Sequence, residues 1–376
     1  MSARAAHAAG ADRLRRLQDA IAERELDALL LDTAVELRYA TGYTGSSGLA
    51  LVPPTDGAAL RDGRPQFLTD FRYVAQSAAE VTPEFERSIV TGELRDSVPD
   101  LLAADRGAIG FDPAKLSVAA HAQLREKLPG GWELTEAGGV VDGLRLVKEE
   151  AEIAAIAAAA TLADQALEEV LAQGLAGRTE RDVAFALETA MRRLGAEAPS
   201  FPSIVASGAH GALPHAQPRD VEIPRGVLVT IDWGAVLDGY CSDCTRTYAT
   251  GEGISERARE VYGLVLDAQL AGLGAVRAGP NGREVDAVAR EAIDGAGQGE
   301  HFGHGLGHGV GLEVHEAPRL SRTAGDEPLR ARSVVTVEPG IYLPDVLGVR
   351  IEDLVVVRDG GGDVLTGLSK DLTVVS

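Results

Sequence analysis

Cysteine is scarce in this sequence: only Cys241 and Cys244 occur, in the stretch CSDC. So few cysteines exclude the disulfide framework of a small secreted domain. The C-x-x-C spacing also occurs in redox pairs. Here it lies in YCSDCTRTY, which is typical of a strand, and residues three apart in a strand point to opposite faces. We therefore predict two free thiols in a cytoplasmic protein.

Long apolar runs are missing as well. A membrane-spanning helix needs a stretch of about 18 or more apolar residues, and the sequence contains none. The first twenty residues, MSARAAHAAGADRLRRLQDA, also lack the apolar segment of a secretory signal. We expect neither membrane insertion nor export.

Basic residues are outnumbered by acidic ones, 36 against 57, which gives a net charge of -21. Nucleic-acid phosphates require a basic face, so this balance argues against a nucleic-acid partner. The excess of acid favours solubility. A chain of 376 residues is too long for one ordinary core, so we expect two domains.

Residues 1–145 alternate short apolar runs with helical stretches. A helix over Ala11–Glu23 precedes the apolar run ALLLDTAV, and another helix covers Ser117–Leu128. This alternation predicts an α/β domain with a mixed sheet flanked by helices. No cluster of catalytic residue types occurs in it.

The remaining residues begin with two helices. The first starts near Lys148 and ends near Gly174, with acidic residues in its first turn, as the helix dipole favours. The second has Thr179 as its N-cap and stops at Gly195. An apparent hairpin follows, VLVTIDWGAVLDGYCSDCTRTYAT.

The same order of elements then repeats. Ser255 caps a long helix to about Val276, and a shorter helix runs from Gly282 to about Asp294. A second apparent hairpin follows, VVTVEPGIYLPDVLGVRIEDLVVV. Two copies of helix, helix and hairpin predict that residues 146–376 form one domain with pseudo-two-fold symmetry, within an α/β (α+β) protein.

Two acidic residues converge on the first hairpin. Asp238-Gly239 is a strong signal for a two-residue turn, and this turn places Asp232 opposite Thr245. Asp243 is then a diagonal neighbour of Asp232 on the same face, at roughly 7–8 Å between Cα atoms. Two acids among apolar neighbours repel each other unless a cation lies between them. In the alternative, one acid caps a turn and the other is solvated.

The second hairpin carries a matching pair. If it is centred on Asp345, Glu338 lies directly opposite Glu352. Four acids from two related hairpins, with a nearby histidine, predict a two-metal site suited to Mn, Co, Zn or Fe rather than calcium. The competing interpretation is a set of buried acids that arginines neutralise, such as Arg246 and Arg350.

The histidines gather in GHGLGHGVGLEVHE, which holds His304, His308 and His315. Phosphate-loop patterns do not fit this stretch, and HExxH fails because Arg319 stands where the second histidine is required. We expect the glycines to adopt positive φ and to let the backbone pass close to a metal centre. His215, in ALPHAQP, is a further candidate from a separate loop.

Taken in order, Asp232, Asp243, His308, Glu338 and Glu352 resemble the ligand pattern of the prolidase and Xaa-Pro aminopeptidase family. That family has the pita-bread fold, which methionine aminopeptidase shares. The resemblance is strong over 146–376, and residues 1–145, with LRYATGYTG, resemble the family's N-terminal domain. One departure is Leu306, where the family pattern His-Gly-Thr-Gly-His has threonine.

The resemblance implies two divalent metal ions per chain, with manganese favoured over cobalt or zinc. It implies that Asp232 holds one ion, that His308 and Glu338 hold the other, and that Asp243 and Glu352 bridge them. A water between the ions would be the nucleophile, and Glu338 would take its proton.

Further roles follow from the resemblance alone. His315 would stabilise the substrate carbonyl, while His304 and His215 would bind the proline side of the substrate. Arg350 would orient the acids near the ions, and Thr245 would lie beside them.

The implied reaction is hydrolysis of the peptide bond before proline in Xaa-Pro dipeptides by a homodimer. Arg319 would pair with the free carboxylate of a dipeptide; in the alternative, it is a solvated surface arginine. The 14-residue spacing from Glu338 to Glu352 resembles the shorter prolidase type. The alternatives are an Xaa-Pro aminopeptidase acting on longer peptides, a creatinase-like C–N hydrolase without metal, and a non-catalytic peptide-binding module.

Overall fold

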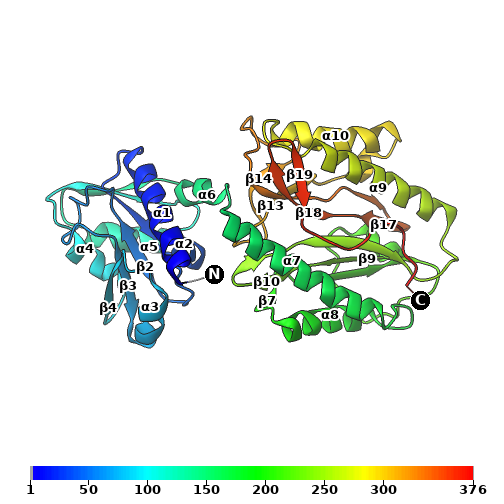
Figure 1. Ribbon diagram of the computed structural model, residues 1–376, viewed down its shortest axis with the longest axis horizontal. Coiled ribbons are helices and arrows are strands. Elements are labelled where there is room, and N and C mark those ends of the chain that lie inside the picture. The colour runs from blue at the N-terminus through cyan, green and yellow to red at the C-terminus, as the bar shows by residue number, and fades with distance from the viewer. Residues whose placement is uncertain (1–2, 376) are drawn as a thin grey trace. The chain divides into compact units, whose positions relative to one another are not determined.

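The computed structural model describes residues 3–375. The chain forms two compact units, Met1–Arg145 and Leu146–Ser376 (Figure 1). Among the described residues, no helix combines the length and the apolar character needed to cross a membrane.

A six-stranded sheet forms the centre of the first unit, with strand order β4-β3-β2-β1-β5-β6. Its strands pair in parallel in β1–β5, β3–β4 and β5–β6, and antiparallel in β1–β2 and β2–β3, so the predicted mixed sheet is confirmed. The strands are β1 (Ala28–Leu31), β2 (Leu49–Val52), β3 (Gln66–Asp70), β4 (Glu86–Val90), β5 (Gly107–Phe111) and β6 (Trp132–Glu136).

The described residues of this unit form the α-helices α1 (Ala3–Ala22), α2 (Ala34–Thr41), α3 (Val74–Glu80), α4 (Val98–Leu101), α5 (Val118–Lys127) and α6 (Val140–Arg145). The side chain of Ser117 caps α5, and Leu128 is its C-cap, as predicted. Helix α1 begins eight residues before the predicted Ala11, because the alanine-rich sequence ahead of Ala11 favours helix.

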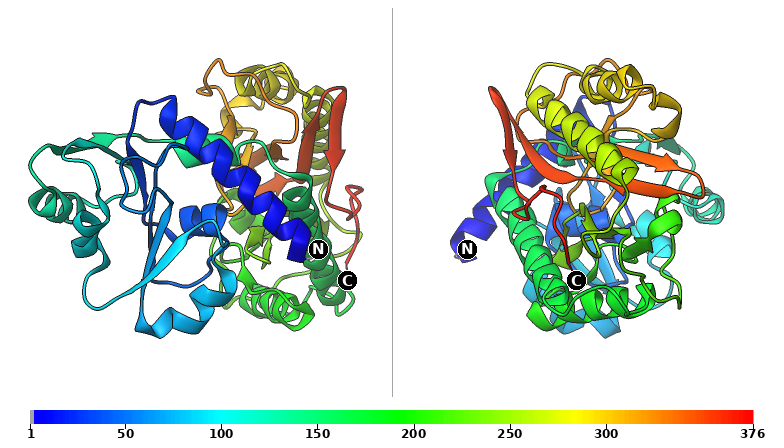
Figure 2. Two further views of the ribbon diagram at one scale, coloured as in Figure 1. Left: turned by 60° about the vertical axis from the view of Figure 1, so that its left-hand side comes forward. Right: turned by 90° about the vertical axis from the view of Figure 1, so that its right-hand side faces the viewer.

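The second unit contains the repeated order that the sequence predicts. Helices α7 (Glu150–Leu171) and α8 (Glu180–Leu194) precede the first hairpin, and α9 (Glu256–Ala275) and α10 (Gly282–Gly295) precede the second. Figure 1 and Figure 2 show the two helix pairs on opposite sides of the strands between them. Buried apolar side chains from each pair pack against the strands of its own half.

Capping residues define most of these helices as expected. Thr179 and Ser255 accept hydrogen bonds from the first turns of α8 and α9, and Gly195 ends α8 in the left-handed conformation. Helix α7 ends at Leu171, a few residues before the predicted Gly174.

The first hairpin consists of two strand pairs with one register. Strand β9 (Leu228–Trp233) pairs with β12 (Cys244–Ala249), and β10 (Ala235–Leu237) pairs with β11 (Tyr240–Cys241). Asp232 lies opposite Thr245, as predicted. The ladder is interrupted between the two pairs, at Asp243.

The second hairpin is interrupted in the same way. Strand β15 (Val334–Val337) pairs with β18 (Asp353–Arg358), and β16 (Gly340–Leu343) pairs with β17 (Leu347–Arg350). The shared register is centred on Asp345, whose φ is 60°, and it places Glu338 opposite Glu352. The predicted pairing is confirmed.

Shorter strands complete the unit. Strand β8 (Ile204–Ser207) extends the β12-β9 pair, and β7 (Ala198–Pro199) extends β11-β10. Strands β13 (Gly307–Gly309), β14 (Glu316–Leu320) and β19 (Gly361–Val364) join β15 and β18 in a five-stranded sheet. Cys241 and Cys244 are free and lie in different core clusters, so their side chains diverge.

Candidate metal centre

Both hairpins deliver their acidic side chains to one place. Side-chain atoms of Asp243, His308 and Glu352 that are able to bind a metal lie within 4.8 Å of one another. The Nε2 atom of His308 lies 3.6 Å from Asp243 Oδ2 and 3.4 Å from Glu338 Oε1. Three of these residues lie at interruptions of the ladders, and His308 lies on the adjoining strand β13.

Each buried acid of the cluster disfavours the ionisation of the others. Burial raises the pKa of Asp243 well above its usual range, and the carboxylates of Glu352, Asp232 and Glu338 raise it further. Burial likewise raises the pKa values of Glu338 and Glu352. Since like charges at such a site cannot all ionise without a counter-charge, the cluster requires bound protons or bound cations.

Two carboxylate oxygens of the cluster are buried without a hydrogen-bond partner among residues 3–375: Asp232 Oδ1 and Glu352 Oε1. Buried acceptors are nearly always satisfied in native proteins. The donor set, four carboxylates and an imidazole, matches the oxygen and nitrogen ligands of divalent transition metals. The residues present therefore fit the metal ions that the resemblance implies.

Arginine neutralises only part of the cluster. The Arg350 guanidinium donates to Asp232 Oδ2 at 2.6 Å and to Thr245 Oγ1 at 3.0 Å. The Thr245 hydroxyl in turn donates to Glu352 Oε2 at 2.7 Å. Within the described part of the chain, no guanidinium is hydrogen-bonded to the carboxylate of Asp243, Glu338 or Glu352, so arginines do not explain the whole set.

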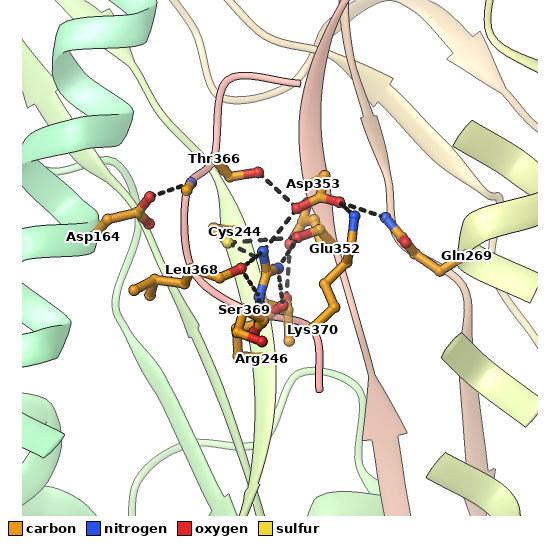
Figure 3. Close-up of polar contacts among 12 residues, drawn as sticks. Asp164, Cys244, Arg246, Gln269, Glu352, Asp353, Thr366, Leu368, Ser369 and Lys370 are labelled. Atoms are coloured by element: carbon orange, nitrogen blue, oxygen red, sulfur yellow. Dashed lines mark hydrogen bonds and ion pairs between the residues drawn. The ribbon is translucent and has the colours of Figure 1, made fainter. Parts of the chain in front are cut away.

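The competing interpretation has Arg246 neutralise the acids of the cluster, but its ion-pair partner is a different acid. Its guanidinium pairs with Asp353 Oδ1 at 2.8 Å, with both side chains only 1% exposed (Figure 3). It also donates to the backbone carbonyl of Glu352 and to that of Leu368. Arg246 thus supports the backbone of an acidic residue rather than neutralising its carboxylate.

Asp353 collects further donors beside the cluster. Its Oδ2 accepts from Gln269 at 2.8 Å and from Lys370 at 2.6 Å, and its Oδ1 accepts from Thr366 at 2.7 Å. Figure 3 shows these donors arriving from α9 and from the segment after β19. Sequence reasoning missed Asp353, although an acid directly after Glu352 in an apolar strand was a signal.

The three histidines of the glycine-rich stretch lie at or beside the acids. His308 Nδ1 lies 3.1 Å from the Gly309 carbonyl oxygen, an arrangement that leaves Nε2 facing the acids. The rings of His308 and His315 pack edge to face with centroids 4.3 Å apart. Burial lowers the pKa values of His304, His308 and His315, which favours neutral imidazoles.

His304 is connected to the acids through Tyr342. Its Nε2 lies 2.8 Å from the Tyr342 hydroxyl, which accepts from Arg350 at 2.9 Å. Tyr342 was missed because a tyrosine in GIYL suggests an ordinary core residue. Its pKa is raised to about 12, chiefly by burial.

His215 and Arg319 have exposed side chains. A charge on His215 lowers the pKa values of His304 and His315, so His215 lies within electrostatic reach of both. Arg319 lies opposite His308 across the β13–β14 pair. Both residues therefore lie around the cluster without joining it.

The glycines provide the close approach that was expected. A Cβ at Gly307 would lie 2.0 Å from the Thr336 carbonyl oxygen, and one at Gly309 would lie 2.1 Å from that of Ala317. The expectation of positive φ was wrong, because none of the five glycines at 303–311 has it. Backbone crowding within the sheet, rather than turn geometry, requires glycine here. Leu306 is fully buried in the core.

The sequence matches the model of metallopeptidase family M24 over residues 154–359 and that of the creatinase/prolidase N-terminal domain over 13–147. It is 35% identical to an Xaa-Pro dipeptidase of Pyrococcus furiosus, covering 96% of this chain and 99% of that protein. The structure is similar to an Xaa-Pro dipeptidase from Bacillus anthracis, with a TM-score of 0.90 and 39% identity over 97% of this chain and 99% of that one.

An X-Pro aminopeptidase from Thermotoga maritima is also similar, with a TM-score of 0.84 and 36% identity over 93% of this chain and 98% of that one. The predicted resemblance and the pita-bread fold are thus confirmed. The chain belongs to metallopeptidase family M24 and carries the N-terminal domain of creatinases and prolidases.

Proposed function

We propose that this metallopeptidase hydrolyses the peptide bond before proline in Xaa-Pro dipeptides and that two divalent metal ions support the reaction. The observation that carries the proposal is the grouping of Asp243, His308 and Glu352, with Glu338 and Asp232 beside them. Two buried carboxylate oxygens of this cluster are left without a hydrogen bond within residues 3–375. Similarity to Xaa-Pro dipeptidases supports the substrate class.

In this proposal, Asp232 would hold one ion, His308 and Glu338 would hold the other, and Asp243 and Glu352 would contribute ligands to both. We propose manganese as the metal, with cobalt or zinc as alternatives. When bound, the ions would polarise the substrate carbonyl and lower the pKa of an attacking water.

The chain's own residues then handle protons and substrate. Glu338, whose pKa burial raises, accepts the proton of the attacking water. His315, whose ring packs beside His308, donates to the substrate carbonyl oxygen and stabilises its developing charge. His304 and His215 contact the proline side of the substrate.

Arg350 and Thr245 keep the acids in place. Arg350 reaches Asp232 and Tyr342, and Thr245 connects Arg350 with Glu352. Because Arg350 and Thr245 fix the directions of these carboxylates, their lone pairs are oriented before a cation arrives.

Proline as the second residue suits this chemistry. The bond before proline is a tertiary amide, whose nitrogen carries no N–H for a backbone-binding cleft to recognise. A site that acts on the carbonyl does not need that N–H. The exposed Arg319, opposite His308, would pair with the terminal carboxylate of a dipeptide.

Comparing an Xaa-Pro dipeptide with an Xaa-Pro-Xaa tripeptide tests the proposal, with added Mn or Co and again with a chelator. We expect metal-dependent hydrolysis that prefers the dipeptide. A strong preference for the tripeptide would instead support the Xaa-Pro aminopeptidase assignment, for which the Thermotoga maritima structure is a precedent. Arg319→Met should weaken dipeptide binding, whereas Arg322→Met, an exposed arginine just after β14, is the matched control.

We also propose that the protein is a cytoplasmic homodimer. Light scattering at the exit of a size-exclusion column measures the oligomeric state directly, and a monomer at micromolar concentration would contradict the dimer.

A further inference from the structure

Glu180 is the first residue of α8, and its side chain is fully buried. Among residues 3–375, every hydrogen-bond partner of its carboxylate comes from one segment, residues 207–219, here named the His215 loop. Its Oε1 accepts from the Ser207 backbone N–H at 2.9 Å, the Ser207 hydroxyl at 2.8 Å and Arg219 Nη2 at 2.9 Å. Its Oε2 lies 3.0 Å each from His210 Nδ1, the Arg219 backbone nitrogen and Arg219 Nε.

These contacts close the base of the loop. Ser207 and Arg219 are the two ends of the His215 loop, and both donate to the same carboxylate. A loop of this length with its ends held together is an Ω-type loop, which keeps its shape through its own contacts. Glu180 therefore acts as the common acceptor that joins the two ends.

The tip of the loop lies against the candidate metal centre. The Pro214 carbonyl accepts from Arg350 at 3.2 Å, and His215 follows it. Nearby, Gly211 packs so closely on β17 that a Cβ at Gly348 would lie 1.8 Å from the Gly211 carbonyl oxygen. A shift at the base of the loop would therefore move groups that contact Arg350.

The carboxylate is charged in this setting. Although burial raises the pKa of Glu180, the hydrogen bonds from Arg219 and Ser207 lower it to about 2. A buried charge that collects six donors makes stronger hydrogen bonds than a neutral acceptor would. Glutamine at position 180 is a sensitive probe. Its NH2 group is a donor, and it would face three other donors whichever way the amide is oriented.

We propose that Glu180 is a positioning residue that closes the base of the His215 loop and so fixes His215 for substrate binding. The substrate-binding part of this inference rests on the proposed function. The closure of the loop does not, since it follows from the hydrogen bonds alone.

The experiment compares Glu180→Gln with Asp182→Asn in the full-length, metal-loaded protein. Asp182 is an exposed acid in the same first turn of α8, so its variant removes the same charge from the same helix end. Hydrogen exchange over residues 207–219, KM and kcat for an Xaa-Pro dipeptide, and bound metal are measured for both.

For Glu180→Gln we expect exchange in the loop to rise about tenfold or more, as the loss of a charged hydrogen bond implies. KM should rise by a similar factor, with a smaller change in kcat and with unchanged bound metal. Asp182→Asn should match the unmodified protein in every readout. Unchanged loop exchange in Glu180→Gln, or equal effects in both variants, would overturn the proposal.

A second pair of variants covers the case in which Glu180→Gln does not fold. Arg219→Gln removes two of the six donors from a half-exposed side chain, and the exposed Arg225 supplies the control, Arg225→Gln. Faster loop exchange in Arg219→Gln alone is expected, and equal exchange in the two variants would contradict loop closure. If no Xaa-Pro peptide is hydrolysed at all, the proposed function fails, whereas loop exchange still judges the closure.

Discussion

Glu338 and Glu352 lie directly opposite each other across the second hairpin, although neither belongs to a strand. The register is the same on both sides of them, with Val337 opposite Asp353 and Gly340 opposite Arg350. The ladder is interrupted only where the acids lie, so two carboxylates converge while the hairpin remains intact around them.

Replacing Glu352 should remove metal. Glu352→Gln keeps the size of the side chain but loses the negative charge and one of the two oxygens that can bind a metal. We therefore expect metal affinity to fall by more than about 100-fold and hydrolysis to fall with it. Elemental analysis after dialysis measures the bound metal. Asp345→Asn, at the tip of the same hairpin, is the control, and full metal retention in Glu352→Gln would contradict the proposed ligand set.

Metal should also stabilise the folded protein. At a free concentration of about 100 times Kd, a ligand adds about 2.7 kcal/mol to the free energy of unfolding, which corresponds to roughly 5–10 °C in Tm for a domain of this size. Chelator-treated protein titrated with Mn or Co in a thermal melt should show this rise, and calcium should give little. A Tm that no transition metal changes would argue against the site.

The Arg246–Asp353 pair should be critical for stability. Both side chains are 1% exposed, and removing Asp353 leaves the buried Arg246 guanidinium without a carboxylate, at a cost of about 3–5 kcal/mol. Asp353→Asn should lose about this much in urea unfolding. Arg246→Met should lose less, because Lys370 still pairs with Asp353 at 2.6 Å, and the double variant should lose less than the sum. The exposed pair Arg257–Glu260, 3.5 Å apart on α9, is the control, where Arg257→Met should change stability by less than about 1 kcal/mol.

Asp164 should weaken the fold at neutral pH. Burial raises its pKa to about 6, despite the hydrogen bond from Gly367, and its Oδ1 lacks a hydrogen-bond partner within the described chain. Because the folded pKa exceeds the unfolded one, the penalty is fully present above about pH 6 and is relieved as pH falls toward the usual value of 3.8.

We therefore expect Asp164→Asn to be more stable than the unmodified protein at pH 7.5, by about 1–2 kcal/mol. The advantage should shrink toward pH 4. Thermal melts across this range measure the difference, with the exposed Glu291→Gln on α10 as the control. An advantage that does not depend on pH would exclude titration of Asp164 as its cause.

The elements that could be predicted are those with local chemical signals. Asp238-Gly239 defines the first turn and Asp345 the second, so both registers followed from residues beside the turns. Ser255 was recognisable as a cap because capping depends on contacts within one helix turn. The acids were then placed by counting along strands.

The contacts that could not be predicted join residues far apart in the chain. Asp353 is 107 positions from Arg246, and Arg219 is 39 positions from Glu180. A charged residue in an apolar strand indicates that a partner exists, but no local pattern names the partner. The same applies to Tyr342, which lies 38 positions from its partner His304.

The division of the acids between two hairpins has a consequence for biosynthesis. The proposed ligands extend from Asp232 in one half of the domain to Glu352 in the other. A growing chain can fold its first unit and its first hairpin while the second hairpin is still unmade. It cannot assemble the complete metal centre until synthesis has passed Glu352, so metal loading and peptidase activity would both wait for the second half of the domain.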